Sequence, residues 1–219
     1  CGTAMRLVGR VAFPLFAFMI AEGAAHTRDR RRYALRLLLL AVISEIPFDL
    51  VAGGTWLFPA DQNTVFTLLL GLLAVWAGDL ICGSGSGVSY GNREKTGDGG
   101  RKAADQRRFP LEYERYIRIL AAVPFGLAAY YLKTDYGFMG VLLIVILYTL
   151  RTEPQLRTAV CAVFLFCMYM DFYGAAACVA IFLINRYNGE KGSGNGRIFY
   201  LFYPLHLLVI RGIKLAVGL

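Results

Sequence analysis

Residues 26–32 read HTRDRRR and separate two apolar stretches, 11–25 and 37–52. Four residues of this gap are basic. The alternation continues along the chain, with further apolar stretches at 64–82, 117–132, 136–150, 158–184 and 198–217. Repeated long apolar stretches between polar gaps are typical of a protein that crosses a membrane several times. We therefore predict an all-α fold, a polytopic transmembrane helical bundle that forms a single domain over residues 1–219.

Basic residues gather in every second gap. The gap at 83–115 carries seven lysines and arginines, whereas the gap at 53–62 carries none and the gap at 133–135 carries only Lys133. Cytoplasmic loops hold the Lys/Arg excess of membrane proteins. We therefore expect 26–32 and 83–115 in the cytosol and the other two gaps outside. This predicts a multi-pass protein of the cytoplasmic membrane, with the lipid bilayer as its first partner.

The composition agrees with a membrane protein. Of 219 residues, 57% are hydrophobic, and the mean hydropathy is +0.52. The net charge of +8 follows from basic loops beside anionic lipid, so we expect no nucleic-acid partner. The five cysteines include no C-x-x-C pair, which predicts neither a metal site nor a disulfide framework. The chain begins at Cys1 without an initiator Met, and we expect that upstream residues are missing.

The stretch 158–184 leaves seven or eight spanning segments open. It could form one long helix or two short ones that turn at Asp171. Asp135-Tyr136-Gly137 before one apolar run resembles Asp171-Phe172-Tyr173-Gly174 before another, as in a weak repeat of a helical hairpin. Two crossings also place the basic gap at 185–197 in the cytosol. We favour the turn and eight segments.

A Gly-rich, charged segment interrupts the apolar pattern at about 83–115. It reads GSGSGVSYGNREKTGDGGRKAADQRR over 83–108 and is poor in large apolar residues. Such a composition cannot bury enough surface to offset the entropy of ordering. We predict a disordered cytosolic loop.

Charged residues inside apolar stretches are functional candidates, because their cost in hydrocarbon is tolerable only if they face each other, water or substrate. Glu45 and Asp49 lie four residues apart, hence on one helix face, with Pro47 between them. Arg10 lies in the first segment, and His206 lies near the middle of the last. We predict that Arg10, Glu45, Asp49 and His206 form a catalytic cavity that opens outward. The alternative is that Arg10 and Arg6, which lies one turn before it, only neutralise the two carboxylates as structural pairs.

Further polar residues are candidates for substrate binding. Asn63, Asp135 and Tyr136 fall at or near the outer surface. His26 and Arg28 lie in the cytosolic basic cluster, which could receive an anionic ligand or could serve only to hold the loop in the cytosol.

Five strings, in order, carry a family resemblance. They are GRVAFPLFAFMIAEGAAHTRDRRRYALRLLLLAVISEIPFDL, QNTVFTLLLGLL, DYGFMGVLLIVILY, YNGEKG and FYPLHLL. Together they span Arg6 to about Ile210, and they resemble the TraX family, with the Gly-rich loop as an insertion-like stretch.

The resemblance implies a membrane protein of conjugation systems, whose founding member N-acetylates pilin. It also implies kinship with membrane acyltransferases. The expected activity is transfer of an acetyl group from acetyl-CoA to an amine or hydroxyl, on pilin or another acceptor on the outer side. Family members usually carry an Asp-His pair ahead of the Gly-Arg-x-Ala-Phe-Pro string, and this chain starts too late to contain it.

Two other functions fit the residues alone. Intramembrane carboxylates could relay protons or bind a cation in a transporter or channel. The chain could also be a non-catalytic component of a conjugation or secretion apparatus. Composition and spacing by themselves do not separate the enzyme from the transporter.

Overall fold

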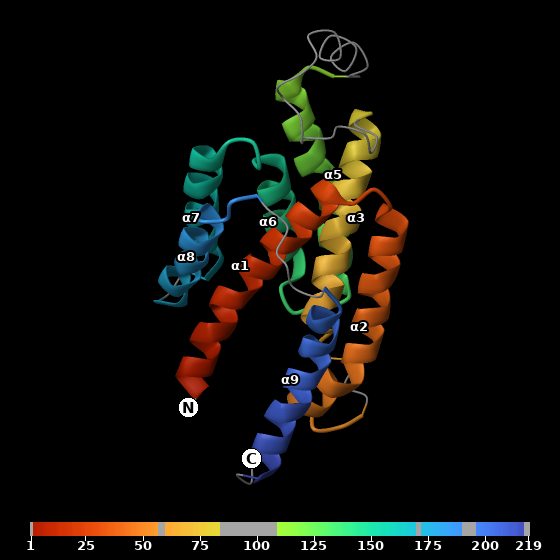
Figure 1. Cartoon of the computed structure of the whole chain (residues 1–219), viewed down its shortest axis with the longest axis vertical. Coiled ribbons are helices and arrows are strands. Elements are labelled where there is room, and N and C mark those ends of the chain that lie inside the picture. The colour runs from red at the N-terminus through yellow and green to blue at the C-terminus, as the bar shows by residue number, and fades with distance from the viewer. Residues whose placement is uncertain (1, 57–59, 84–108, 170–171, 190–195, 217–219) are drawn as a thin grey trace.

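The computed structural model describes residues 2–56, 60–83, 109–169, 172–189 and 196–216. These residues form a bundle of eight α-helices (Figure 1). In chain order they are α1 (Gly2–His26), α2 (Arg30–Ala52), α3 (Thr64–Cys82), α5 (Leu111–Tyr131), α6 (Gly137–Thr149), α7 (Pro154–Tyr169), α8 (Phe172–Asn185) and α9 (Gly196–Ala216). The predicted all-α fold is confirmed.

Polar caps set the start of two helices. Helix α2 begins after Asp29, whose side chain accepts a hydrogen bond from the backbone N–H of Arg32 at 3.0 Å. Helix α3 begins after Asn63, whose Oδ1 accepts from the N–H of Val65 at 2.9 Å. These bonds satisfy N–H groups that have no partner in the first turn of a helix. Helix α3 ends at Gly83, where φ is 73°, a left-handed conformation that glycine adopts without strain.

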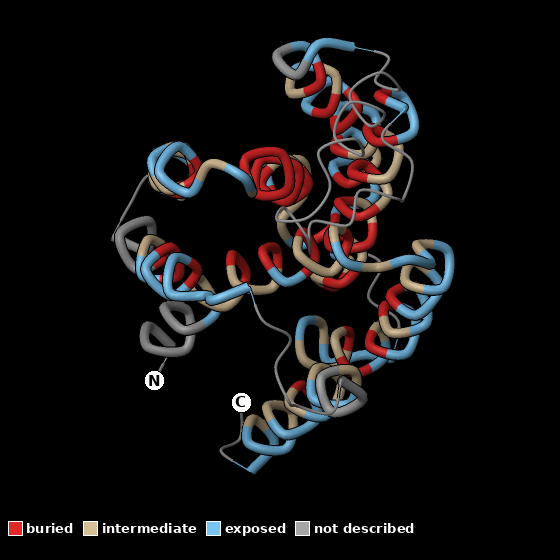
Figure 2. The backbone as a smooth tube through the Cα atoms, turned by 45° about the horizontal axis from the view of Figure 1, so that its top comes forward, coloured by how far each residue is buried: buried red, intermediate tan, exposed pale blue. Residues whose placement is uncertain are grey.

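Helix α6 lies at the centre of the bundle. Its residues from Gly140 to Thr149 are nearly all buried, and Figure 2 shows its tube in red along most of its length. Helices α1, α3, α5 and α7 pack around it. Gly140 permits this close approach, because a Cβ atom there would lie 2.6 Å from Cγ2 of Thr67 and 2.9 Å from Cζ of Phe13. Small residues at such contacts are typical of helix bundles in membranes.

The apolar stretch 158–184 forms two helices rather than one. Helix α7 ends at Tyr169 and α8 begins at Phe172, which places the break where the sequence predicts the turn. Asp171 itself lies outside the described residues. The hairpin of α7 and α8 follows that of α5 and α6, and the helices of each hairpin pack against each other. The predicted break into two helices is therefore confirmed, and the described residues form eight helical segments.

The predicted loop at 83–115 ends earlier than expected. Residues 84–108 lie outside the described residues, and helix α5 already begins at Leu111. The sequence explains this start, because Glu114 in the first turn brings negative charge to the positive end of the helix dipole.

Apolar side chains cover much of the outer surface of the bundle. By length and composition, α3 is the one described helix that could cross a membrane by itself, with 19 residues and a mean hydropathy of 2.1 in its most apolar part. Helix α2 nevertheless exposes a row of apolar side chains, each between 41% and 62% exposed: Leu35, Leu38, Leu39, Val42, Ile43 and Ile46. Their spacing of three and four residues puts them on one face of the helix. This face turns away from the core.

The connections fall at two ends of the molecule (Figure 1). The turn between α1 and α2, the end of α3 and the start of α5 lie together at what we call the basic end, marked by Arg30, Asp79 and Arg118. The loop before α3 and the turn between α5 and α6 lie at what we call the acidic end, marked by Glu45 and Asp135. The gaps that are rich and poor in Lys and Arg thus occupy opposite ends.

Candidate functional site

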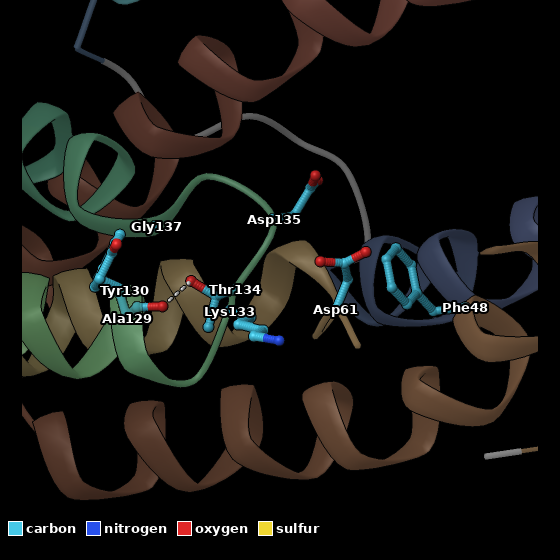
Figure 3. A pocket seen from close by; sticks show the side chains of 8 residues that line it. All are labelled: Phe48, Asp61, Ala129, Tyr130, Lys133, Thr134, Asp135 and Gly137. Carbon is cyan, nitrogen blue, oxygen red and sulfur yellow. Dashed lines mark hydrogen bonds between the residues drawn. The ribbon is translucent and has the colours of Figure 1, made fainter. Parts of the chain in front are cut away.

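Two loops hydrogen-bond to each other at the acidic end. The backbone N–H of Gln62 donates to the carbonyl of Lys133 at 3.0 Å, and the N–H of Asp135 donates to the carbonyl of Gln62 at 3.1 Å. The hydroxyl of Thr134 donates to the carbonyl of Ala129 at 3.3 Å (Figure 3). Lys133 has a φ of 53°, a left-handed conformation that is uncommon outside glycine. The two gaps predicted to share one side of the membrane are therefore joined directly.

A pocket of about 400 Å³ lies beside these loops. Its lining residues come from α2, both loops and the ends of α5 and α6: Phe48, Asp61, Ala129, Tyr130, Lys133, Thr134, Asp135 and Gly137. Figure 3 shows the carboxylates of Asp61 and Asp135 and the ammonium of Lys133 as separate groups around it. Within the described part of the chain, no ion pair joins Lys133 to either carboxylate. The pocket thus presents negative and positive groups that a ligand could bind.

Asp135 is the acidic group best placed to act on a bound molecule. Its Oδ2 accepts a hydrogen bond from the hydroxyl of Thr64 at 2.6 Å. The residue is exposed to the pocket, yet many protein atoms surround its carboxyl at longer range, and this desolvation raises the pKa of Asp135. The Thr64 hydrogen bond and the positive charge of Arg10 lower the pKa without cancelling the rise. A carboxylate with a raised pKa is a stronger base.

Glu45 is bonded to the start of α3. Its Oε2 accepts hydrogen bonds from the backbone N–H of Asn63 at 3.3 Å and from Nδ2 of the same residue. That Nδ2 also donates to the carbonyl of Ala41 at 2.8 Å. Asn63 is fully buried, and its Oδ1 caps α3. Its amide therefore fixes α2 against α3, beside the pocket residues that follow in the chain.

Arg10 of α1 reaches the same end through aromatic side chains. Its guanidinium carbon lies 4.6 Å from the ring centroid of Tyr169, at the end of α7. Tyr136, which precedes α6, stacks on Phe13 with the ring centroids 3.5 Å apart, and its hydroxyl donates to the carbonyl of Gly9 at 3.5 Å. Helices α1, α6 and α7 thus meet around a cationic and aromatic cluster.

The structure brings the four residues that were predicted to form a catalytic cavity only partly together. Arg10 lies against Tyr169 and Glu45 is bonded to Asn63. The side chain of Arg6 lies outside the described residues, so the structural pairs stay a prediction. Asp49 is buried one turn beyond Glu45. His206 is half-buried on α9, where its Nδ1 hydrogen-bonds the carbonyl of Phe202 at 3.2 Å and its ring stacks on that of Phe202. None of these four predicted residues lines the pocket, whereas Asp135 does.

Helix α9 contributes Tyr203 to the acidic end. The Tyr203 hydroxyl interacts with Thr64 and lies within electrostatic range of Asp135 and Glu45. Further along the helix, Nζ of Lys214 donates to the carbonyl of Val51 at 2.9 Å, which fastens α9 to the end of α2. Tyr203 was not among the residues predicted from the sequence, although it lies next to Pro204 in the FYPLHLL string.

The basic end holds a buried charge network around Asp79, which is only 2% exposed. Its Oδ2 accepts from Nη2 of Arg30 at 2.7 Å, and its Oδ1 accepts from Nε of Arg118 at 3.0 Å. The hydroxyl of Tyr148 also donates to Oδ2. Nη2 of Arg118 reaches Oε2 of Glu114 at 3.2 Å. One carboxylate therefore joins α2, α3, α5 and α6.

The comparison with known proteins agrees with this layout. A sequence model described as TraX protein matches residues 2–82 and 109–214. The chain belongs to the TraX family. The matched ranges contain both polar clusters and leave out residues 83–108, the stretch expected to be insertion-like.

TraX relatives include a protein named for fimbrial assembly. "Probable fimbrial assembly protein FimC, serogroup H1" of Dichelobacter nodosus is 26% identical over 235 residues, which cover 96% of this chain and 83% of that protein. No solved structure matches the chain.

His26 and Arg28, the predicted cytosolic ligand residues of this TraX-family chain, lie at the basic end and not beside the pocket. Both are exposed, and Nδ1 of His26 lies 3.6 Å from the carboxylate of Glu22. Arg32 is also exposed in this turn. They form a cationic surface next to the buried network of Asp79.

Asp79 was not among the residues predicted from the sequence. The signal was present, because Asp79 is the one charged residue in the apolar stretch 64–82. Its partners Arg30, Arg118 and Tyr148 come from three other helices. No spacing rule within one helix could have connected them.

Proposed function

We propose that this TraX-family chain is a multi-pass membrane acyltransferase that takes part in the assembly of pili or fimbriae. Membership of the TraX family and the name of the Dichelobacter nodosus relative support this setting. The donor we propose is acetyl-CoA, and the acceptor is an amine or hydroxyl on pilin or on another protein at the outer face. The observation that carries the chemistry is the pocket with Asp135 at the acidic end.

The surface of the bundle supports its place in the membrane. The apolar row on α2 faces outward, and α5 exposes a second row at similar spacing: Tyr113, Tyr116, Leu120, Val123, Leu127 and Tyr130. Exposed apolar area on this scale is unusual for soluble proteins and suits contact with lipid tails. Because the loops rich in Lys and Arg gather at the basic end, we assign that end to the cytosol and the acidic end to the outside.

The pocket can supply a base and a cation for acyl transfer. In such a step the acceptor N–H or O–H loses its proton, its N or O atom bonds to the thioester carbonyl carbon, and the C–S bond breaks to release the coenzyme thiolate. The Asp135 carboxylate would take the proton. Lys133, which lines the same pocket, can stabilise the oxyanion of the tetrahedral intermediate. Arg10 does not line the pocket and acts on Asp135 through its charge. Glu45, Asp49 and His206 do not line the pocket, and their part in the chemistry stays a prediction.

The donor would bind at the opposite end. The cationic surface of His26 and Arg28 suits the phosphate groups of acetyl-CoA. Asp79 and Thr64 mark the two ends of α3, fifteen residues apart, which is about 22 Å at 1.5 Å per residue. Because the acceptor attacks the thioester directly, the flexible arm of the coenzyme would have to span that distance and bring the thioester carbonyl to the pocket.

The core between the ends supports an enzyme over a channel. Leu72, Val141 and Ile144 fill the space between α3 and α6, and each is completely buried. Among the described residues, apolar side chains packed in this way leave no polar path for an ion between α3 and α6.

Acetyl transfer by the purified protein in detergent tests the proposal. Labelled acetyl-CoA is offered with a primary amine acceptor, and the Asp135→Asn variant is compared with Asp61→Asn. Both variants remove one carboxylate from the same pocket, but only Asp135 is hydrogen-bonded to Thr64 and close to Arg10. We expect transfer by the wild type and a loss of about 10²-fold or more for Asp135→Asn alone. Absence of transfer together with ion-driven flux in liposomes would favour the transporter.

A further inference from the structure

The helices at one side of the bundle are too short for a bilayer of ordinary thickness. Helices α6, α7 and α8 have 13, 16 and 14 residues, or about 20, 24 and 21 Å. The hydrocarbon core of a bilayer is about 30 Å thick. Helices α1 and α2 have 25 and 23 residues, which is enough to cross it. Because α6 is buried, the short helices that face lipid are α7 and α8.

Helices α1 and α9 extend beyond the polar residues of the acidic end, Arg10, Lys133 and Asp135, which we call the acidic-end cluster. The contact between Arg10 and Tyr169 sets the end of α7 level with Arg10 on α1, and eight residues of α1 precede Arg10, about 12 Å of helix. Helix α9 continues thirteen residues beyond Tyr203, to Ala216, about 20 Å. Figure 1 shows both helices extending past the turn between α5 and α6. The cluster is therefore recessed beside α1 and α9, and level with the helix ends at α5 and α7.

Helix α5 has 21 residues, about 31 Å, but its exposed tyrosines lie closer together than its ends. Tyr113 and Tyr116 near the basic end and Tyr130 and Tyr131 near the acidic end are all at least 61% exposed. Tyrosine is enriched where a membrane meets water. Tyr116 and Tyr130 are fourteen residues apart, about 21 Å. On this side the distance between the two membrane–water interfaces is thus smaller than the thickness of an ordinary hydrocarbon core.

We propose that the bilayer is locally thinned along α5, α7 and α8, with the outer lipid headgroups drawn down to the level of Arg10 and Asp135. The proposal rests on the membrane placement given under the proposed function. Thinning is one way in which a membrane accommodates short hydrophobic segments. It would keep the charges of Arg10, Lys133 and Asp135 out of hydrocarbon. It would also let water and headgroups enter the cluster sideways, past the end of α7.

A native cysteine tests this without any mutation. Cys167 is exposed on α7, two residues before the end of that helix. Spheroplasts that express the full chain are treated from outside with a charged, membrane-impermeant maleimide, and the modified peptide is identified by mass spectrometry. Only a thiol in contact with water ionises and reacts. The buried thiols Cys82 and Cys161 serve as internal controls.

Three single cysteine variants give reference reaction rates for positions in water and in the membrane. Lys133→Cys reports the outer aqueous phase and Val123→Cys reports the middle of α5. Ile46→Cys is the matched control, because Ile46 follows Glu45 at the level of the cluster but belongs to the exposed apolar row of α2, on the long side. We expect Cys167 to react within about tenfold of Lys133→Cys and at least about a hundredfold faster than Ile46→Cys.

The outcomes separate the two proposals. If Cys167 reacts no faster than Ile46→Cys while Lys133→Cys reacts, hydrocarbon or a partner covers the hairpin and the thinning is refuted. If Val123→Cys reacts as fast as Lys133→Cys, the membrane placement itself is wrong, and the setting of the proposed enzyme fails with it.

Discussion

At the scale of single residues, two carboxylates of the acidic end differ in their role: Glu45 stabilises the fold, and Asp135 faces the pocket. Glu45 is committed to Asn63 and through it to the start of α3. Asp135 has one hydrogen bond from Thr64 and still faces the pocket. Two carboxylates at the same end of the bundle, one in α2 and one in a loop, therefore have different tasks, and the partners of each decide which.

The pH dependence of acetyl transfer should report Asp135. A carboxylate base is active when deprotonated, so the rate rises as the pH passes upward through the pKa of that group. Because desolvation raises the pKa of Asp135, this rising limb of the pH–rate profile should lie at a pH above about 3.9, the pKa that is usual for aspartate. We expect this limb in the wild type and in Asp61→Asn, and we expect its loss in Asp135→Asn. The measurement is kcat/KM against pH. An unchanged limb in Asp135→Asn would assign the base to another group.

His206 and Glu45 provide a second test at this scale. We expect His206→Asn and Glu45→Gln to be expressed and inserted but to lose specific activity, because their shape is kept and their proton chemistry is not. Specific activity per folded protein, taken from size-exclusion chromatography and transfer assays, checks this. Full activity in both well-folded variants would leave His206 as a packing residue against Phe202 and Glu45 as a partner of Asn63.

At the scale of elements, the bundle is tied together at the basic end by Asp79. Arg30 brings α2, Arg118 brings α5 and Tyr148 brings α6 to one carboxylate on α3. Gly78, the residue before Asp79, allows this approach, because a Cβ atom there would lie 3.2 Å from the Cα of Arg118. Charge and close packing therefore act at the same crossing of α3 and α5.

Removing Asp79 should destabilise the fold strongly. Asp79→Ala leaves Arg30 and Arg118 buried without their shared counter-ion, and breaking such a network costs about 3–5 kcal/mol. The free energy of unfolding in mixed micelles measures this. The matched control is Glu153→Gln, which breaks the Arg115–Glu153 pair, whose side chains are 42% and 40% exposed, and should cost less than about 1 kcal/mol. Equal losses in both variants would contradict the central role of Asp79.

The contact of α6 with its neighbours should not tolerate a larger residue at Gly140. A methyl group there meets Thr67, Tyr136 and Phe13 at less than 3 Å, and overpacking of this kind costs about 1–3 kcal/mol. Gly212→Ala on α9 is the control, since nothing lies within 4 Å of an added Cβ atom. We expect a lower melting temperature for Gly140→Ala and an unchanged or slightly higher one for the control, because alanine favours helix.

At the scale of the whole molecule, the distribution of charge predicts how the bundle is oriented. Reporters inserted at 26–32, 83–115 and 185–197 should be found in the cytosol, and reporters at 53–62 and 133–135 outside. The joined loops at Gln62 and Lys133 require the last two sites to agree with each other. Alkaline phosphatase and fluorescent protein fusions measure this. A reporter at 185–197 that is active only outside would refute the placement of α7 and α8.

The sequence by itself determined the helical class and the ends at which charges gather. These follow from local properties: the length of apolar runs, the Lys/Arg bias of the gaps, and the turn signals near Asp135 and Asp171. It also carried the TraX family strings, which the comparison confirmed. All of these are properties of contiguous residues and need no knowledge of which helices touch.

Only the tertiary structure decided which polar groups meet. Arg10 could have paired with Glu45 by charge alone, yet it lies against Tyr169, and Glu45 is bonded to Asn63. Asp79 found its partners on three other helices. The physical reason is that the energy of a buried polar group depends on distances of a few ångströms between elements far apart in sequence. Helix packing sets those distances, and the pattern along a single helix does not contain them.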